Sequence, residues 1–549
     1  MNSLLKNKVI VKILKNIGIK STEAADAFLF PSYDQLHDPA LLNDINKAAD
    51  RLLKARDTET IFIHGDYDVD GITATYILTK GLRALGFKVI PFIPNRHLDG
   101  YDIRSKSVDL ALEKGCSLIL TCDCGTSALD TVTYANSKGI DVIITDHHLP
   151  KSSLPAAVAI VNPHLGSYPF EDLCGAVVAL KVIQYISRKI NLDFEELALD
   201  KFIDVAALGI IADVVPLLDE NRVLAKFGLR KMRKTSCKGL AAILNAIKLE
   251  GNLSAHDVAF KVAPRLNAVG RLDAASKALD LLLTSNEEEA KELAKTLDKF
   301  NRTRQETQAD ILMQAEFLIN SQQLDKNPVI ICYGTNWNSG VGGIVAGKIA
   351  DKYKKPCIVM NLNDEGILHG SARSVEGFHL VNNLDKVKEY LISYGGHSLA
   401  AGMSVAKRNF SEFKRTLFER CDPIPEFAEK DSFIEIDMKD VNLSLAMSLL
   451  KFEPFGEKNE KPVFKTKVRV SSKAIMGKLQ AHLRLDLIDP DSDYSDVISG
   501  VAWRHAFDWG MLVDEGDVIY VTYTLEVNEY NGNVSPQMMI QSLELLSES

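Results

Sequence analysis

The sequence lacks any long apolar run. No stretch approaches the ~18 consecutive apolar residues that a helix needs to cross a bilayer, so an integral membrane protein is excluded. Residues 1–20 alternate lysine with isoleucine, valine and leucine, and they contain neither the continuous apolar segment nor the small-residue cleavage site of a signal peptide. We therefore expect an untargeted protein that works in the cytoplasm and has no membrane partner.

Paired cysteines and two common catalytic signatures are missing as well. The eight cysteines are scattered, and the close pair Cys122 and Cys124 has no second pair to complete a zinc site. Reduced thiols in a reducing compartment fit this distribution. The sequence has no Gly-x-Ser-x-Gly turn and no Walker lysine motif, which disfavours serine hydrolases and P-loop enzymes.

Basic charge is not in excess either. The formal net charge is −9, whereas nucleic-acid-binding proteins usually present a basic face. A carboxylate-rich metal site carries negative charge of its own, however, and basic clusters such as residues 230–234 can lie elsewhere on the surface. Net charge therefore does not decide whether the partner is a nucleic acid.

The pattern of the first half predicts a parallel, doubly wound α/β sheet. At 549 residues the chain is too long for one core, since cores stop growing near ~250–300 residues. Short apolar runs alternate with helical patterns such as residues 72–85 and 128–138. The predicted strands are residues 60–64, 88–93, 118–122, 142–145 and 158–161.

The second half predicts a long helix, a smaller α/β segment and a β-barrel. Residues 286–322 contain no Gly or Pro, and Ser285 and Glu288 have the spacing of a capping box. β-rich runs after residue 432 and a hairpin signal at Asn531–Gly532 suit an OB-like barrel. The predicted domains are residues 1–285, 286–325, 326–428 and 429–549.

Three aspartates at alternate positions, Asp66, Asp68 and Asp70, directly follow the first predicted strand. Carboxylates this close repel one another, and divalent cations neutralise them most naturally. A solvated acidic turn and an EF-hand fragment are the alternatives. An EF-hand would need a glutamate where Ile77 stands.

Further candidate ligands follow other strands. Asp123 follows the strand at 118–122, and Asp146 with His147 and His148 follows the strand at 142–145. The carboxyl ends of parallel strands share one edge, where ligands bind. Adjacent histidines diverge, so one is expected to face a metal and the other to contact a ligand or the substrate.

Asp213 interrupts an otherwise apolar run, residues 205–218. A buried carboxylate needs a partner, and a helix or turn cap is the alternative to a metal. Because other candidate ligands converge on the same edge, we favour metal binding.

These motifs resemble those of the DHH phosphoesterase family. The resemblance lies in the segments 64–71, 122–125, 145–148 and 212–215. It implies two divalent ions, with Mn²⁺ expected and Mg²⁺ the alternative. One ion would be held by His64, Asp68 and Asp123, and the other by Asp70, Asp123, His147 and Asp213. Asp66 and His148 would act beside the ions, and the catalytic group would be Asp66, Asp68, Asp70, Asp123, His147 and His148.

Two such ions explain how the chemistry proceeds without a nucleophilic side chain. Held ~3.5–4 Å apart, they can activate water, hold the scissile phosphate and stabilise the leaving oxygen of an in-line displacement.

Glycine-rich segments indicate phosphate binding in the second α/β segment. Residues 339–343 precede a helix, whose exposed amides can receive a phosphate, although a tight structural turn is equally consistent. Residues 395–402 resemble the glycine-glycine-histidine motif of the DHH-associated domain. The resemblance implies that Ser371, Arg373 and His397 bind substrate phosphates.

Within the DHH family, the chain is most similar to the RecJ exonucleases. Segments that shorter relatives lack carry this resemblance: residues 263–273, Asn301–Arg302, and 454–456 near 462–464. It implies that Arg96, Arg265 and Arg271 meet DNA phosphates, with a structural ion pair as the alternative for each.

Two further segments bear on the RecJ-like interpretation. At residues 337–342 the sequence departs from the usual RecJ pattern after the tryptophan. In the barrel region, Trp503, His505, Phe507 and Trp509 could stack on single-stranded bases or belong to the core.

The resemblance implies a two-metal exonuclease that degrades single-stranded DNA from its 5′ end to 5′ mononucleotides, in DNA repair and recombination. A single-strand-binding protein and a helicase are expected partners. One alternative is a phosphodiesterase for short oligonucleotides or cyclic dinucleotides. A non-catalytic RecJ-like replication subunit is disfavoured because every expected ligand is present, and a pyrophosphatase would need no arginine-rich module or barrel.

Overall fold

In the computed structural model, residues 4–95, 102–190, 195–249, 253–270, 276–425, 433–492, 496–530 and 532–546 are described. The chain divides into two compact units. The first comprises Met1–Phe92, Tyr101–Ala263 and Glu429–Ser549, and the second comprises Ile93–Gly100 and Pro264–Ala428. No described helix combines the length and the apolar character that crossing a membrane would require.

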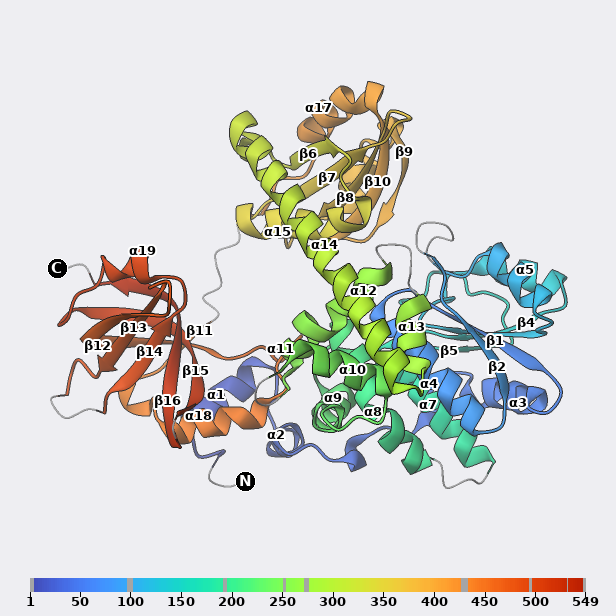
Figure 1. Ribbon diagram of the computed structural model, residues 1–549, viewed down its shortest axis with the longest axis horizontal. Coiled ribbons are helices and arrows are strands. Elements are labelled where there is room, and N and C mark those ends of the chain that lie inside the picture. The colour runs from blue at the N-terminus through green and yellow to red at the C-terminus, as the bar shows by residue number, and fades with distance from the viewer. Residues whose placement is uncertain are drawn as a thin grey trace. The chain divides into compact units, whose positions relative to one another are not determined.

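A five-stranded, wholly parallel sheet forms the centre of the first unit, as predicted (Figure 1). Its order is β2-β1-β3-β4-β5, so the chain reverses direction across the sheet between β1 and β3. Every residue of β3 is buried, which agrees with a sheet covered on both faces. The strands are β1 Thr60–Gly65, β2 Lys88–Phe92, β3 Leu118–Cys122, β4 Asp141–Thr145 and β5 Ala159–Val161.

Helices pack on this sheet, and further helices pack on them to form a helical layer. Helices α5 and α6 share an apolar core with strand residues such as Phe62, Ile119 and Val142. Helices α4, α7 and α8 pack against one another, and α9 packs on α8. The bounds are α3 Ile45–Ala55, α4 Val69–Ala84, α5 Ser105–Glu113, α6 Leu129–Ser137, α7 Gly175–Lys189, α8 Glu195–Ala212, α9 Asp219–Met232, α10 Lys238–Ile247 and α11 Ala255–Asp257, followed by the π-helix η3 Val258–Val262.

The C-terminal part of the first unit is the predicted barrel. Its sheet has the order β11-β12-β13-β14-β16-β15, and pairing of β12 with β15 closes five of these strands into a ring. Its elements are β11 Phe433–Glu435, α18 Leu443–Leu449, β12 Val463–Met476, β13 His482–Ile488, β14 Ile498–Ala502, α19 Ala506–Gly510, β15 Val518–Tyr530 and β16 Asn533–Leu545. Asn531 of the predicted hairpin signal lies outside the described residues.

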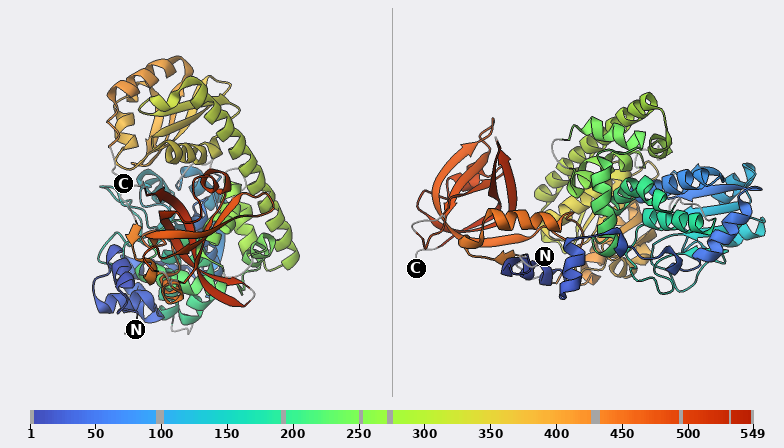
Figure 2. Two further views of the ribbon diagram at one scale, coloured as in Figure 1. Left: turned by 90° about the vertical axis from the view of Figure 1, so that its left-hand side faces the viewer. Right: turned by 90° about the horizontal axis from the view of Figure 1, so that it is seen from below.

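The N-terminal helices belong to the barrel core, which the sequence analysis did not predict. Helices α1, Lys8–Asn16, and α2, Thr22–Leu29, lie beside α18 and the barrel (Figures 1 and 2). Val9, Ile13 and Phe28 share one apolar core with Phe464 and Tyr523 of the barrel. The lysine and apolar alternation at the N-terminus therefore marks an amphipathic helix whose apolar side is buried.

A 36-residue helix, α14 Glu287–Gln322, dominates the second unit and confirms the predicted long helix (Figure 1). The predicted capping box at Ser285 and Glu288 is wrong. Asn286 is the N-cap, because its side-chain oxygen accepts the amides of Glu288 and Glu289 at 2.9 and 3.3 Å. Helices α12 Ala263–Gly270 and α13 Ser276–Leu283 precede it.

The second unit also holds a mixed sheet of order β6-β7-β8-β10-β9. Strands β6 and β7 are parallel, and the other neighbours are antiparallel. The elements are β6 Ile330–Thr335, α15 Ser339–Tyr353, β7 Cys357–Leu362, β8 Ile367–Arg373, α16 Leu380–Asp385, β9 Leu391–Gly396, β10 Ala400–Ala406 and α17 Phe410–Arg420. Short 3₁₀ helices lie at η1 Tyr33–Gln35, η2 Pro39–Leu41, η4 Leu324–Lys326, η5 Lys388–Tyr390, η6 Lys407–Asn409, η7 Met438–Asp440 and η8 Leu450–Phe452.

Candidate metal centre and phosphate site

The acidic segment after β1 lies where the strand order of the first sheet reverses. Strands β1 and β3 are hydrogen-bonded neighbours, and Gly65 lies beside Cys122, so the residues that follow both strands meet at one edge. Asp68 caps α4, its side-chain oxygen accepting the amide of Gly71 at 3.0 Å. Asp70, in the first turn of α4, is buried.

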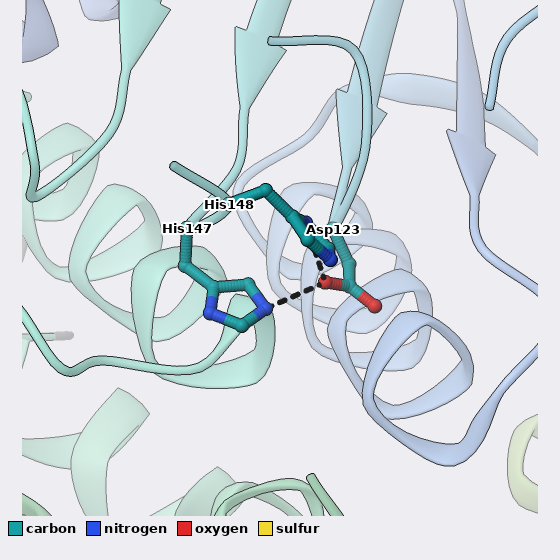
Figure 3. Close-up of side chains that lie close together, drawn as sticks. All are labelled: Asp123, His147 and His148. Atoms are coloured by element: carbon teal, nitrogen blue, oxygen red, sulfur yellow. Dashed lines mark ion pairs between the residues drawn. The ribbon is translucent and has the colours of Figure 1, made fainter. Parts of the chain in front are cut away.

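Asp123 turns toward His147 and His148 at the ends of β3 and β4 (Figure 3). Its backbone has φ +62°, and its amide donates to the carbonyl of Thr145 at 3.0 Å. The left-handed conformation, which aspartate tolerates, redirects the side chain at the strand end. Its Oδ1 lies 3.0 Å from Nε2 of His147 and 3.9 Å from Nδ1 of His148.

Asp70 is held by the amino end of α7. Its two carboxylate oxygens accept the backbone amides of Gly175 and Ala176, the latter at 2.9 Å. The positive end of the helix dipole favours the charged carboxylate there. A side chain at residue 175 would not fit, because its Cβ would lie 2.7 Å from Cβ of Asp123 and 2.9 Å from Oδ2 of Asp70.

Asp213 directly follows the last residue of α8 and approaches the same imidazole. Nε2 of His147 lies 3.5 Å from Oδ2 of Asp213 and 3.7 Å from Oδ2 of Asp70. The structure therefore brings together Asp70, Asp123, His147 and Asp213, which come from four separate segments of the chain. These four residues are the set that family resemblance assigns to one ion.

The electrostatics of this cluster require positive charge. Burial raises the pKa of Asp123 well above its usual range, and the neighbouring carboxylates raise it further. The same two causes raise the pKa of Asp213 to about 9 and that of Asp70 to about 6. Buried carboxylates that repel one another are the donor set that a divalent cation stabilises.

Within the described residues, three groups of side chains offer ligand atoms that lie within 4.8 Å of one another. They are Asp70 with His147 and Asp213, Asp123 with His147 and His148, and Asp66 with Asp68 and Asp123. Mixed oxygen and imidazole donors fit Mn²⁺ and Mg²⁺. His64 lies near the end of β1, buried, with its ring centroid 5.6 Å from that of Phe92. The groups add Asp66 to the candidate ligands, and His64 as a ligand stays a prediction.

The two adjacent histidines differ in their electrostatic surroundings. Burial and the charge of His148 lower the pKa of His147 to about 4, so its imidazole is neutral at neutral pH. Its hydrogen bond to the backbone of Leu173 leaves Nε2 for the carboxylate cluster. Burial would also lower the pKa of His148, but its hydrogen bond with Asp146, at 2.8 Å, outweighs this and raises it to about 9. The hydrogen bond to Asp146 therefore favours the protonated form of His148.

Asp146 holds the turn after β4 in place through hydrogen bonds. Burial would raise its pKa, yet the hydrogen bond and charge of His148 lower it to about 2. Its oxygens also accept the amides of Thr126, His147 and His148. We infer that Asp146 positions the histidine pair.

Sequence reasoning missed two residues beside the centre. Asn162 is buried and donates to the carbonyl of His148 at 2.9 Å and to Oγ1 of Thr126 at 3.1 Å. Its position directly after β5 was a usable signal, because that strand ends at the same edge. Asp102, whose pKa is raised by burial and by Asp146, was not predicted, and no pattern pointed to it.

The predicted phosphate-binding residues gather at one end of the second sheet. Ser371 pairs with Gly402, and Arg373 with Ala400, across β8 and β10. The amino end of α15 lies against both, since a Cβ at Gly343 would be 3.5 Å from the Arg373 guanidinium and 3.7 Å from Ser371. The amino end of a helix beside an arginine suits an anion, although the first turn of α15 is largely buried and the Gly340 amide already donates to Oδ1 of Asn338 at 2.8 Å. His397 directly follows β9, which pairs with β10, and its side chain is exposed.

Of the three arginines predicted to contact DNA, the structure describes one. Arg96 and Arg271 lie outside the described residues. Arg265 forms an ion pair with Asp298 of α14 at 2.8 Å, and Arg302 pairs with the same carboxylate. Arg265 thus has the structural partner that was the alternative to DNA contact, and its role toward DNA stays a prediction.

Trp337, in the segment that departs from the family pattern, has a structural role. Its ring is buried and its Nε1 donates to Gln314 of α14 at 2.9 Å. It therefore ties the long helix to the second sheet.

The barrel aromatics fall into two groups. Trp503 and Phe507 are exposed, whereas Trp509 packs against the core and stacks on His505 with ring centroids 3.8 Å apart. Of these four residues, Phe507 and Trp503 are the ones exposed enough to meet a ligand, and the Trp503 ring also meets that of His482 at 4.7 Å.

Comparisons with known proteins cover nearly the whole chain. The DHH family N-terminal domain matches residues 60–210, the DHHA1 domain matches 326–422, and the RecJ OB domain matches 434–542. The single-stranded-DNA-specific exonuclease RecJ of Haemophilus influenzae is 32% identical to this chain. The aligned region covers 100% of this chain and 98% of that protein. RecJ of Bacillus subtilis is 33% identical, with 97% of this chain covering 67% of it.

Solved structures agree with the sequence comparisons. Thermus thermophilus RecJ in complex with Mn²⁺ superposes with a TM-score of 0.81 at 29% identity, covering 98% of this chain and 76% of that one. A structure of exonuclease RecJ bound to manganese gives a TM-score of 0.64 at 34% identity, covering 72% of this chain and 98% of that one. On the 32% identity to Haemophilus influenzae RecJ over nearly the full length of both chains, the protein belongs to the RecJ family.

Proposed function

We propose that the protein is a metal-dependent exonuclease that degrades single-stranded DNA from the 5′ end and releases 5′ mononucleotides in DNA repair and recombination. The convergence of Asp70, Asp123, His147 and Asp213 at the reversal point of a parallel sheet carries this proposal. The relatives bear the name single-stranded-DNA-specific exonuclease RecJ, and this chain matches the DHH, DHHA1 and RecJ OB domains.

Two divalent ions, Mn²⁺ by preference with Mg²⁺ as the alternative, would be held by this cluster. Asp123 would contribute to both ions, with Asp70, His147 and Asp213 on one side and Asp68 with Asp66 or His64 on the other. When bound, such ions activate water and neutralise charge at a phosphodiester.

The chain's own residues orient and neutralise the substrate. His148, whose pKa is raised to about 9 by Asp146, would present a protonated imidazole to the scissile phosphate or the leaving oxygen. Arg373 would form paired hydrogen bonds to a substrate phosphate, with Ser371, His397 and the amides of α15 as further donors. No side chain is required as a covalent nucleophile.

The barrel would supply single-strand affinity. Trp503 and Phe507 are exposed on it, and base stacking on such rings tolerates any sequence. We also propose a single-strand-binding protein and a helicase as partners. None of the eight cysteines, all of which lie in the described part of the chain, forms a disulfide, which supports our expectation of a reducing, cytoplasmic location.

Polarity and strand specificity test the proposal. One long single strand, labelled at either end, and the matching blunt duplex are incubated with enzyme and Mn²⁺, and products are separated by size. The 5′ label should appear at once as mononucleotide, and the 3′ label should remain on a shrinking strand. Early release of the 3′ label, equal degradation of blunt duplex, or cleavage of dinucleotides alone would contradict it.

A further inference from the structure

The first turn of α9 contains three consecutive buried polar side chains, Glu220, Asn221 and Arg222. Each contacts a different part of the first unit. Glu220 binds the Lys181 ammonium at 2.6 Å, and Asn221 donates to the carbonyls of Asp172 and Pro216. Burying a polar group costs free energy unless it is hydrogen-bonded or ion-paired. Three such residues in a row therefore indicate that several segments of the chain meet at the start of α9.

Arg222 is 1% exposed, and every hydrogen bond recorded for its guanidinium among the described residues goes to a backbone carbonyl. Nε donates to Phe28 at 2.8 Å. The two terminal nitrogens donate to four consecutive carbonyls at 2.8–3.5 Å, those of Lys451, Phe452, Glu453 and Pro454. Within the described residues, no carboxylate lies at ion-pair distance from it. Five N–H donors in a fixed plane match this arrangement, and a lysine could not reproduce it.

The four consecutive carbonyls belong to a segment inside the barrel region, between α18 and β12. Residues 451–459 run from η8 toward β12 and contain no regular strand or helix after Phe452. Asn459 donates to the carbonyls of Phe452 and Pro454, both at 2.8 Å, and the amide of Leu217 donates to Glu457 at 2.9 Å. Arg222 and the Asn459 side chain therefore satisfy the four consecutive carbonyls of residues 451–454.

The same guanidinium also fixes the N-terminal helices. Its carbon lies 3.8 Å from the ring centroid of Phe28, and that ring meets Phe452 edge-on at 5.7 Å. Phe28 belongs to α2, which shares the barrel core. One side chain of α9 thus contacts both helix α2 and the segment at 451–454 inside the barrel region.

We propose that Arg222 is a positioning residue that holds the barrel on the catalytic domain, and that the grip of the enzyme on long single strands depends on it. This inference rests on the proposed function, since it assumes that the barrel binds strand beyond the cleaved end. Arg222 does not touch the metal centre. The contacts toward that side are made by Asn221, which bonds Pro216 next to the Asp213 loop and Asp172 before α7.

This separation makes the role measurable. Substitution of Arg222 removes its contacts with Phe28 and residues 451–454 but leaves the metal-ligand cluster intact. The rate of hydrolysis of a 5′-phosphorylated dinucleotide should therefore change by no more than about twofold. On a long single strand, KM should rise by about tenfold or more while kcat changes little, because lost barrel contacts weaken capture.

Arg222→Met and Arg222→Lys are compared with Arg83→Met in the full-length protein loaded with Mn²⁺. Arg83 is a matched control, because it is an exposed arginine that donates to one carbonyl, that of Val89. Hydrogen exchange of peptides covering residues 451–459 gives a readout that is independent of activity. These amides should exchange about tenfold faster in both Arg222 variants, while those of β1 and β3 should not change.

Each outcome decides the proposal. Faster exchange at 451–459 with a rise of KM confined to long strands supports it. Unchanged exchange in folded Arg222→Lys, or a parallel loss on both substrates, overturns it. If Arg222→Met does not fold, Arg222→Lys and Asn459→Ala provide the same comparison, since both weaken the hold on the same carbonyls. Absence of exonuclease activity in the unmodified protein would refute the proposed function, and the exchange data would still test the joint.

Discussion

Gly175→Ala tests whether the close approach of α7 sets the position of the metal ligands. The new methyl group would lie 2.7 Å from Cβ of Asp123, 2.9 Å from Oδ2 of Asp70 and 3.1 Å from Cγ of Asp123. Carbon atoms in contact normally lie ~3.5–4.0 Å apart. One of the two aspartates, or the amino end of α7, must therefore move by about 1 Å. The amide that donates to Asp70 is retained, so the substitution isolates the effect of the added volume.

The expected magnitudes follow from that displacement. Overpacking of this kind costs about 1–3 kcal/mol, which corresponds to a melting temperature lower by roughly 1–2 °C per kcal/mol for a unit as large as the first one. Misplacing catalytic groups by about 1 Å can lower the rate by about 10²-fold, and disturbed support of the ligands weakens metal binding by about 10–100-fold. In open space, replacing a helical glycine by alanine would instead stabilise the helix by about 0.5–1 kcal/mol.

The assay measures kcat/KM on a 5′-phosphorylated dinucleotide during a Mn²⁺ titration, together with the metal content of dialysed protein and its melting temperature. Gly510→Ala is the matched control, because its methyl group would meet only Leu483, at 3.9 Å. Turnover and Mn²⁺ affinity of Gly175→Ala within about twofold of the unmodified enzyme would refute the reasoning, and so would a raised melting temperature.

Four further outcomes are expected. Asp123→Ala should lower turnover by several orders of magnitude and empty both metal sites, whereas His64→Ala should be partly rescued by excess Mn²⁺; metal analysis and rate against [Mn²⁺] check this. The pKa of Asp213 is raised to about 9, so metal-free protein holds a proton there that Mn²⁺ must displace. Apparent Mn²⁺ affinity should therefore rise with pH up to about 9, and the stability of the metal-free fold should fall as pH rises through the same range, as calorimetry can measure. Arg373→Ala should slow hydrolysis with both metals retained. Trp503→Ala should weaken long-strand binding by about 1–3 kcal/mol and leave dinucleotide turnover unchanged.

The architecture could be predicted because local pattern and tertiary structure agree. Fully apolar runs such as residues 118–122 became buried parallel strands, and the polar residues placed directly after them became the candidate centre. The topology alone brings Asp70, Asp123 and His147 together, since strands of one parallel sheet end at one edge. The long helix was visible because no glycine or proline interrupts it.

Contacts between residues far apart in sequence could not be predicted. Nothing local in Arg222 indicates that its donors meet carbonyls more than two hundred positions away, and Gly175 carries no sign that it lies against Asp70. The capping error at Ser285 has a more local cause. Asn286 competes for the same amides, and asparagine and serine are comparable N-caps, so spacing alone could not choose between them.

Because the N-terminal helices share the barrel core, deleting the barrel does not test its role in DNA binding cleanly. Val9, Ile13 and Phe28 are buried against barrel residues, so removal of the chain after about residue 430 would expose their apolar side chains to water. Each such side chain loses roughly 1.5–3 kcal/mol of burial, and the truncated protein would bind DNA poorly for reasons unrelated to the barrel surface. Loss of binding on truncation is therefore ambiguous. Substitution of exposed barrel rings, and of the buried joint at Arg222, separates the two causes because each leaves this shared core in place.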